Sequence, residues 1–126
     1  MATLNLEGKT ILIVEDDDMS YIFLNQIFKL TKGSILRAKS GWKALQLFRN
    51  DPEIDLVLMD IQLPDINGNI VTSEIRTINR NIPIIAQTAG RTPQDIDAAI
   101  AAGSSDVITK PFTMEILIKV LKKYFI

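Results

Sequence analysis

The spacing of the apolar residues changes repeatedly along this sequence, between two patterns. Short apolar runs alternate with longer segments in which apolar residues recur every three or four positions. The first run, residues 11–14, reads Ile-Leu-Ile-Val, and such an uninterrupted run is typical of a strand buried on both faces. Strands that alternate with helices predict an α/β fold, in which right-handed crossovers cover both sides of a parallel sheet.

Five strand–helix units can be placed along the 126 residues, which fit one domain. The predicted strands are residues 11–14, 34–38, 54–59, 82–87 and 105–109. The predicted helices are residues 19–30, 41–50, 69–78, 93–102 and 113–125. Gly103 is expected to end the fourth helix, because glycine tolerates the backbone conformation found there.

The first predicted helix rests on both its apolar spacing and its end signals. Its apolar residues at helical spacing are Met19, Ile22, Phe23, Ile27 and Leu30. Asp17 or Asp18 can cap its first turn, and capping is the expected role of Asp18. Gly33 is expected to end the helix.

Composition excludes several classes of protein. With no cysteine and no histidine, the chain forms neither disulfides nor thiolate or imidazole metal sites, and it has no histidine base. Its 14 basic and 15 acidic residues argue against nucleic-acid binding. No signal peptide is visible, and no apolar run approaches the roughly 20 residues that cross a bilayer. We therefore expect one cytoplasmic domain over residues 1–126, with residues 1–8 as an extension or linker and no membrane partner.

Polar residues with related chemistry follow four of the predicted strands. Residues 15–18 (Glu-Asp-Asp-Asp) follow the first strand, Asp60 the third, Thr88 the fourth and Lys110 the fifth. The carboxyl ends of such strands are where functional sites of open α/β sheets lie. Crowded carboxylates need a cation, and a few hard oxygen ligands favour Mg²⁺. Because an aspartate can attack phosphorus and a lysine can neutralise phosphate oxygens, the set predicts phosphoryl transfer to a carboxylate.

Four stretches of the sequence carry a resemblance to a known family. They are ILIVEDD, LVLMDIQLPDING, IIAQTAG and DVITKPF. As a set they resemble the receiver domain of two-component response regulators, from Lys9 to Tyr124. The resemblance implies a flavodoxin-like (βα)5 doubly wound sheet with strand order 2-1-3-4-5. It is compatible with a stand-alone regulator or with the receiver module of a hybrid sensor histidine kinase, to which the phrase IPIIAQTA is similar.

Carried over position by position, the resemblance gives each acidic residue a role. Asp60 becomes the phosphoacceptor, which receives its phosphoryl group from a phosphohistidine. Asp16 becomes a direct Mg²⁺ ligand, and Glu15 a ligand that acts through water. Asp60 itself and the backbone carbonyl of Gln62 complete the protein's share of the coordination, so Mg²⁺ is the implied cofactor.

The same resemblance implies a switch. Thr88 becomes the hydroxyl that bonds the phosphoryl group, and Lys110, with a cis bond to Pro111, becomes the phosphate contact. Phosphorylation would then alter the surface of the fourth helix, fifth strand and fifth helix. The family commonly has Tyr or Phe three residues before the lysine, where this chain has Val107. A valine cannot sweep out a comparable volume, so the resemblance does not extend to an aromatic switch.

The resemblance also implies partners. The phosphodonor would be a sensor histidine kinase or a histidine phosphotransfer protein, since this chain has no histidine. Docking is expected around Asp60 and at residues 19–23. Ile116 and Val120 lie on the flank of the apolar stripe of the last helix, where they either pack in the core or offer a surface for self-association or for a partner. At most weak autodephosphorylation is implied, so the protein is not expected to be an enzyme.

Other interpretations remain open at this point. Taken singly, Thr88 can be a plain strand-end residue and Lys110 a surface lysine. A flavin-binding domain shares the expected fold, but the acids at residues 15–18 would repel a flavin phosphate. An aspartyl phosphatase usually has a second acid two residues after its nucleophile, where this chain has Gln62. A degenerate receiver that serves only as a binding scaffold is the remaining alternative.

Overall fold

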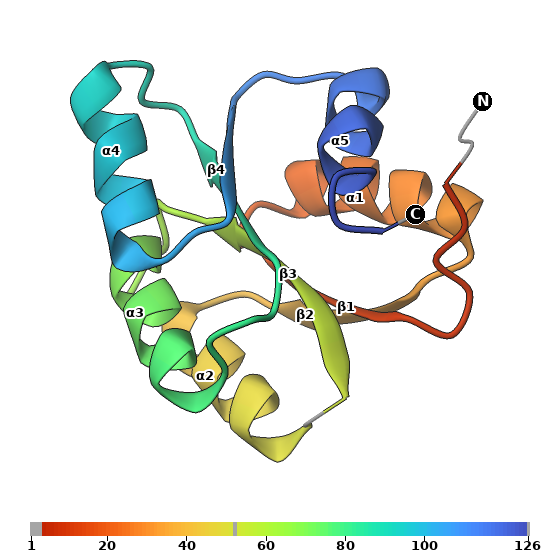
Figure 1. Ribbon diagram of the computed structural model, residues 1–126, viewed down its shortest axis with the longest axis horizontal. Helices are drawn as coiled ribbons and strands as arrows, with labels where there is room; N and C mark the ends of the chain where they lie inside the picture. Colours follow the sequence, from red (N-terminus) through yellow and green to blue (C-terminus); the bar gives the residue numbers. More distant parts are fainter. Residues whose placement is uncertain (1–3, 52, 126) are drawn as a thin grey trace.

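The computed structural model describes residues 4–51 and 53–125. Its strands are β1 (Thr10–Val14), β2 (Ser34–Ala38), β3 (Ile54–Asp60), β4 (Ile84–Thr88) and β5 (Asp106–Thr109). Its helices are α1 (Asp18–Thr31), α2 (Gly41–Asn50), α3 (Gly68–Ile78), α4 (Pro93–Ala102) and α5 (Met114–Leu121). The strands pair in parallel in the order β2-β1-β3-β4-β5 (Figure 1), which confirms the predicted fold class and strand order.

The sheet separates two layers of helices. Figure 1 shows α1 and α5 on one side of the sheet and α2, α3 and α4 on the other. All four residues of the first apolar run, residues 11–14, are 0% exposed. Ile11 and Ile13 join the core beneath α1 and α5, whereas Leu12 and Val14 join the core beneath α2 and α3. The uninterrupted apolar run is therefore explained, because each face of β1 meets a helix layer.

The N-cap of α1 is Asp17, one of the two residues expected to cap this helix. Its carboxylate accepts a hydrogen bond from the backbone N–H of Ser20 at 2.8 Å. The capping role expected of Asp18 is wrong: this residue is the first of the helix and forms ion pairs with Arg37 (2.9 Å) and Lys39 (3.3 Å). The cause is long-range, since Arg37 and Lys39 come from β2 and the turn that follows it.

The apolar residues of α1 do not all face the core. Of the five that show helical spacing, Ile27 is buried, whereas the others are 39–74% exposed: Met19, Ile22, Phe23 and Leu30. The buried face consists of Leu24, Ile27, Phe28 and Thr31. The helix ends at Thr31, and its C-cap is Lys32 in the left-handed backbone conformation (φ 67°), so Gly33 does not end the helix as expected. Gly33 serves a different purpose, because a Cβ there would collide with the side chain of Ile11.

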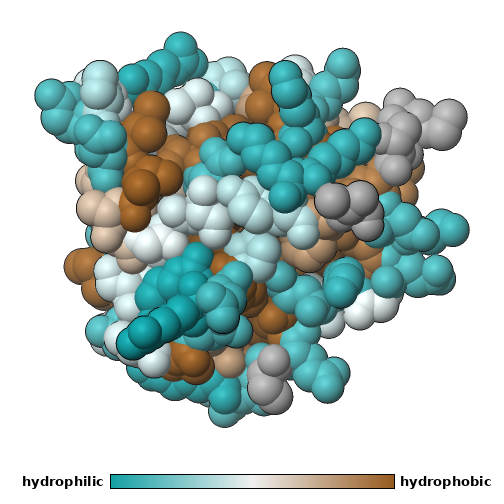
Figure 2. Space-filling view, viewed as in Figure 1, coloured by the Kyte–Doolittle hydropathy of each residue, from teal (hydrophilic) through white to brown (hydrophobic). Residues whose placement is uncertain are grey.

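The two ends of the described chain pack on the same layer. Leu4 and Leu6, from the segment expected to be an extension, are buried with α1 and α5. The last helix is shorter than expected and ends at Leu121, but the Tyr124 hydroxyl donates a hydrogen bond to the Ser105 carbonyl at 2.9 Å. Figure 2 shows hydrophilic side chains over most of one face, with small hydrophobic patches between them. None of the described helices has the length and apolar content needed to cross a membrane.

Candidate functional site

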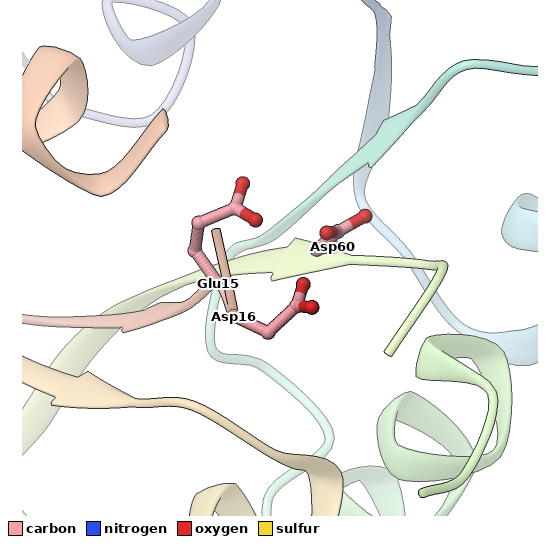
Figure 3. Close-up of side chains that lie close together, drawn as sticks. All are labelled: Glu15, Asp16 and Asp60. Atoms are coloured by element: carbon pink, nitrogen blue, oxygen red, sulfur yellow. The ribbon is translucent and has the colours of Figure 1, made fainter. Parts of the chain in front are cut away.

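Three carboxylates meet at the carboxyl ends of the two central strands. Glu15 and Asp16 directly follow β1, and Asp60 is the last residue of β3, the strand beside it. One carboxylate oxygen from each residue lies within 4.8 Å of the others, and Figure 3 shows the three side chains gathered in one place. Glu15 and Asp60 are 1% and 4% exposed, whereas Asp16 is exposed. The cluster is therefore a buried acidic pair with one solvent-facing acid at its opening.

A lysine lies beside the buried pair. The Lys110 ammonium is 3.4 Å from a carboxylate oxygen of Glu15 and 3.4 Å from Oδ1 of Asp60. It comes from the end of β5, two strands away from β3, so only the assembled sheet brings it here. The bond between Lys110 and Pro111 is cis, as expected. One lysine does not neutralise three carboxylates, so the site keeps a net negative charge.

The loop after β3 completes one side of the site. The backbone N–H of Gln62 donates a hydrogen bond to Oδ1 of Asp60 at 3.1 Å. The N–H of Gly68, at the start of α3, donates to the Ile61 carbonyl at 2.7 Å and closes the loop. The loop therefore holds its backbone against the Asp60 carboxylate, and the part of the Gln62 carbonyl in metal binding stays a prediction.

Thr88 lies at the end of β4 but bonds within its own loop. Its side chain is buried, and its hydroxyl oxygen accepts a hydrogen bond from the Gly90 N–H at 2.9 Å. In the described chain, the short polar contacts of the Asp60 carboxylate are instead with Lys110 and the Gln62 N–H. Val107, whose side chain has no aromatic ring, packs against a small apolar cluster that includes Ala86 of β4 and Ala99 of α4. The structure thus brings Lys110 to the acids, whereas the Thr88 hydroxyl is bonded to the loop that follows β4.

The surroundings of the cluster strongly change the pKa of Glu15. Burial, and then the nearby negative charge of Asp60, raise the pKa of Glu15 to about 7, while Lys110 acts in the opposite direction. Because the Glu15 carboxylate is costly to ionise in this position, a cation bound beside it would stabilise its ionised form. Carboxylate oxygens in small number, with solvent access through Asp16, fit a Mg²⁺ ion that keeps part of its water shell.

The raised pKa of Glu15 predicts how stability depends on pH in metal-free buffer. Since the folded-state pKa (about 7) exceeds the ordinary value of 4.5, this group stabilises the fold fully below pH 4.5. The stabilisation is lost as pH rises through about 7. We expect a fall of about 1–2 kcal/mol in the free energy of unfolding, reduced by the solvent that reaches the cluster. Urea denaturation between pH 5 and 8, with chelator present, measures this fall. In Glu15→Gln the free energy of unfolding should depend less on pH. An equally steep dependence in that variant would show that Glu15 is not the group responsible.

A pocket that the sequence did not reveal adjoins the site. It has a volume of about 570 Å³ and is lined by Met19, Ser20, Phe23, Leu24, Gln87, Lys110, Pro111 and Phe112. Gln87 is 1% exposed, and its amide nitrogen has no hydrogen-bond partner among the described residues. The signal for Gln87 was present in the sequence, as a glutamine inside an otherwise apolar strand, but its neighbours are set by the fold.

Comparisons with known proteins agree with this geometry. The family model of the response regulator receiver domain matches residues 11–122. The two-component response regulator ORR41 of Oryza sativa is 34% identical over 117 residues, which cover 90% of this chain and 92% of that protein. A cyclic di-GMP phosphodiesterase of Thermotoga maritima is 33% identical over 108 residues, and the match covers 86% of this chain but only 28% of that protein.

Among solved structures, one similar chain comes from a complex between two signalling proteins. It is the co-crystal structure of the Saccharomyces cerevisiae histidine phosphotransfer signaling protein Ypd1 and the receiver domain of its downstream response regulator Ssk1. The match has a TM-score of 0.89 and 25% identity, and it covers 98% of this chain and 92% of the other. Together with the match of the family model over residues 11–122, these findings show that the chain belongs to the response regulator receiver domain family of two-component signalling.

Proposed function

We propose that this chain receives a phosphoryl group on Asp60 from a phosphohistidine of another protein. The observation that carries the proposal is the Lys110 ammonium, 3.4 Å from both Asp60 and Glu15 at the mouth of an acidic cluster. In the proposed step, an Asp60 carboxylate oxygen attacks phosphorus, the bond from phosphorus to the imidazole nitrogen breaks, and its electrons leave with the ring. The product is an acyl phosphate on Asp60, with the donor histidine restored.

Each neighbouring residue has a separate role in the proposed phosphoryl transfer. Lys110 supplies a positive charge to the phosphoryl oxygens, and the Gln62 N–H, 3.1 Å from Oδ1, helps to orient the Asp60 carboxylate. Glu15, Asp16, Asp60 and the backbone carbonyl of Gln62 would hold Mg²⁺. When bound, the ion neutralises charge on the transferring group.

Thr88 is the proposed switch. The new group adds a charge of about −1.5 to −2 at Asp60. Thr88 would exchange its bond with the Gly90 N–H for one to a phosphoryl oxygen, and this movement would shift the loop that leads to α4. Val107 would follow by a small packing change rather than by rotation of a ring. Amide chemical shifts of Gly90 that stay unchanged on phosphorylation would argue against this movement.

The test of the proposal is the intact mass of the protein after incubation with acetyl phosphate. We expect a single phosphoryl adduct with Mg²⁺, and little or none in chelator, because the uncompensated acids would repel the donor. Peptide mapping should place the adduct on Asp60. No adduct on a folded protein that also fails to bind Mg²⁺ would favour the alternative, a degenerate receiver that acts only as a binding scaffold.

The pocket beside Lys110 is the proposed docking surface for a histidine kinase or a phosphotransfer protein. Met19 and Phe23 stand on it 74% and 39% exposed, and the rings of Phe23 and Phe112 lie 6.0 Å apart between centroids. These apolar side chains sit next to the phosphoryl-accepting group, where a donor must approach. The Ypd1 complex of a structural neighbour supports a partner of this class.

Phe23→Asp should slow phosphoryl transfer from a phosphotransfer protein such as phosphorylated Ypd1 by about tenfold, because it places a charge in the apolar contact. Phosphorylation by acetyl phosphate should not change, since that donor needs no docking surface. Ile78→Asp is the matched control, as Ile78 is similarly exposed (50%) but lies on α3, across the sheet. Equal slowing with both donors would place the effect in the site and not in docking.

Self-association through α5 is also proposed. Ile116 is 47% exposed, whereas Val120 is partly buried against the core, so Ile116 is the better candidate for a contact. Analytical ultracentrifugation of the wild type and of Ile116→Ser tests this self-association by their oligomeric state. A monomer for both proteins would contradict it. Relatives match this chain over 92% or only 28% of their own length, so stand-alone regulators and modules of larger proteins both occur among them.

A further inference from the structure

The loop between β3 and α3, residues 61–67, carries Gln62 and is held in place at several points. Near its start, the Gln62 N–H contacts Oδ1 of Asp60 at 3.1 Å. At its end, the Gly68 N–H bonds the Ile61 carbonyl at 2.7 Å. A loop closed only on itself could still tilt relative to β1, which supplies the other acids. Its outer part therefore needs a fixed support from elsewhere in the fold.

Asp65 provides such a support at the N-terminus of α2. Its Oδ1 accepts a hydrogen bond from the Gly41 N–H at 2.8 Å, and its Oδ2 accepts one from the Trp42 N–H at 2.9 Å. These are the first N–H groups of the helix, which have no partner within it. Ser40, the local N-cap, bonds the Lys43 N–H instead, so Asp65 caps the helix from a segment 24 residues away.

The electrostatics agree with a carboxylate held by the helix. Although desolvation acts in the opposite direction, the N–H groups of Trp42 and Gly41 lower the pKa of Asp65. The positive end of the α2 dipole favours the same charge. Asp65 is therefore ionised at neutral pH, with one oxygen for each N–H group.

The next residue of the loop is seated on the same helix end. Ile66 packs against Gly41, where an added Cβ would collide with Ile66 and lie 2.8 Å from Val71. Ile66 also joins the core beneath α2 and α3. The hydrogen bonds of Asp65 and the packing of Ile66 thus fix the loop to the N-terminus of α2, and these two residues lie three and four positions after Gln62.

We propose that Asp65 is a positioning residue for the metal site: by tying the loop to the N-terminus of α2, it sets the position of the Gln62 backbone against Asp60. In the sequence, Asp65 stands among turn-forming residues, which do not reveal this contact with a distant helix. The inference rests on the proposed function, because it concerns the Mg²⁺ affinity of the same cluster. Outer-sphere supports of this kind typically change metal affinity by about 10–100-fold.

The test is Mg²⁺ binding, measured by isothermal titration calorimetry on the folded protein. Asp65→Ala should weaken Mg²⁺ about tenfold. Asp65→Asn should weaken it only about two- to threefold, because the amide oxygen still accepts one of the two hydrogen bonds. Trp42, the only tryptophan of the chain, gives a second readout: its fluorescence should respond to Mg²⁺ in the wild type and lose this response in Asp65→Ala.

Asp55→Ala is the matched control. Asp55 also joins distant segments, since its carboxylate accepts from the Thr10 N–H at 2.8 Å, but it lies at the opposite end of the sheet. It should lose stability without any change in Mg²⁺ affinity. Equal weakening in Asp65→Ala and Asp65→Asn would assign the effect to lost charge, and wild-type affinity in Asp65→Ala would also overturn the inference. A wild type that binds no Mg²⁺ and accepts no phosphoryl group would instead refute the proposed function.

Discussion

Asp60→Asn is expected to remove the phosphoryl adduct, lowering the rate of phosphorylation by acetyl phosphate at least about a thousandfold. An amide oxygen has neither the charge nor the nucleophilicity of the carboxylate whose Oδ1 lies 3.4 Å from Lys110. The variant should stay folded, because asparagine has nearly the same volume and can still accept from the Gln62 N–H. The rate of appearance of the adduct in intact-mass spectra measures the effect.

Asp17→Asn is the matched control for this variant. Asp17 lies in the same acidic run, yet its carboxylate caps α1 through the Ser20 N–H, a role that asparagine fills equally well. This control should keep the wild-type rate. An adduct that persists in Asp60→Asn, or that disappears in both variants, would show that the phosphoryl group goes elsewhere or that any loss of charge suffices.

Gly68→Ala should destabilise the protein by about 3 kcal/mol, even though alanine is the better helix former. Gly68 is the first residue of α3, where helix propensity alone would favour alanine by up to about 1 kcal/mol. However, its Cβ would meet the carbonyl oxygen of Asp60 and lie 2.7 Å from Cα of Ile61. These are backbone atoms at the end of a buried strand, and they cannot rotate away.

The free energy of unfolding from urea denaturation tests this prediction, and phosphorylation should slow as well, since the displaced backbone carries Asp60. Gly90→Ala is the matched control, because its Cβ would meet side-chain atoms of Asp95 and no backbone atoms, and this side chain can move if it gives up its capping-box hydrogen bonds with Thr92. We expect a loss of about 1 kcal/mol for Gly90→Ala, the usual cost of a lost helix cap. A Gly68→Ala protein as stable as the wild type would show that the loop relaxes at little cost.

The order of the elements and the chemistry at the strand ends could be predicted from local sequence patterns alone. Uninterrupted apolar runs such as residues 11–14 are typical of strands covered on both sides, and their alternation with helical spacing is why the α/β class could be predicted. Once the strands are parallel, residues that directly follow them share one edge of the sheet. Glu15, Asp60 and Lys110 could therefore be placed together before any distance was known.

Which of several similar residues takes each role became clear only in the folded chain. The spacing in α1 could not show that Leu24 and Phe28 face the core while Met19 and Phe23 stay exposed beside the site. Likewise, the turn sequence around Asp65 could not show that this residue caps a helix 24 residues earlier in the chain. The physical reason is the same in both cases. Local pattern sets what a segment can form, whereas burial and hydrogen-bond partners depend on segments that are distant in sequence and meet only in the folded chain.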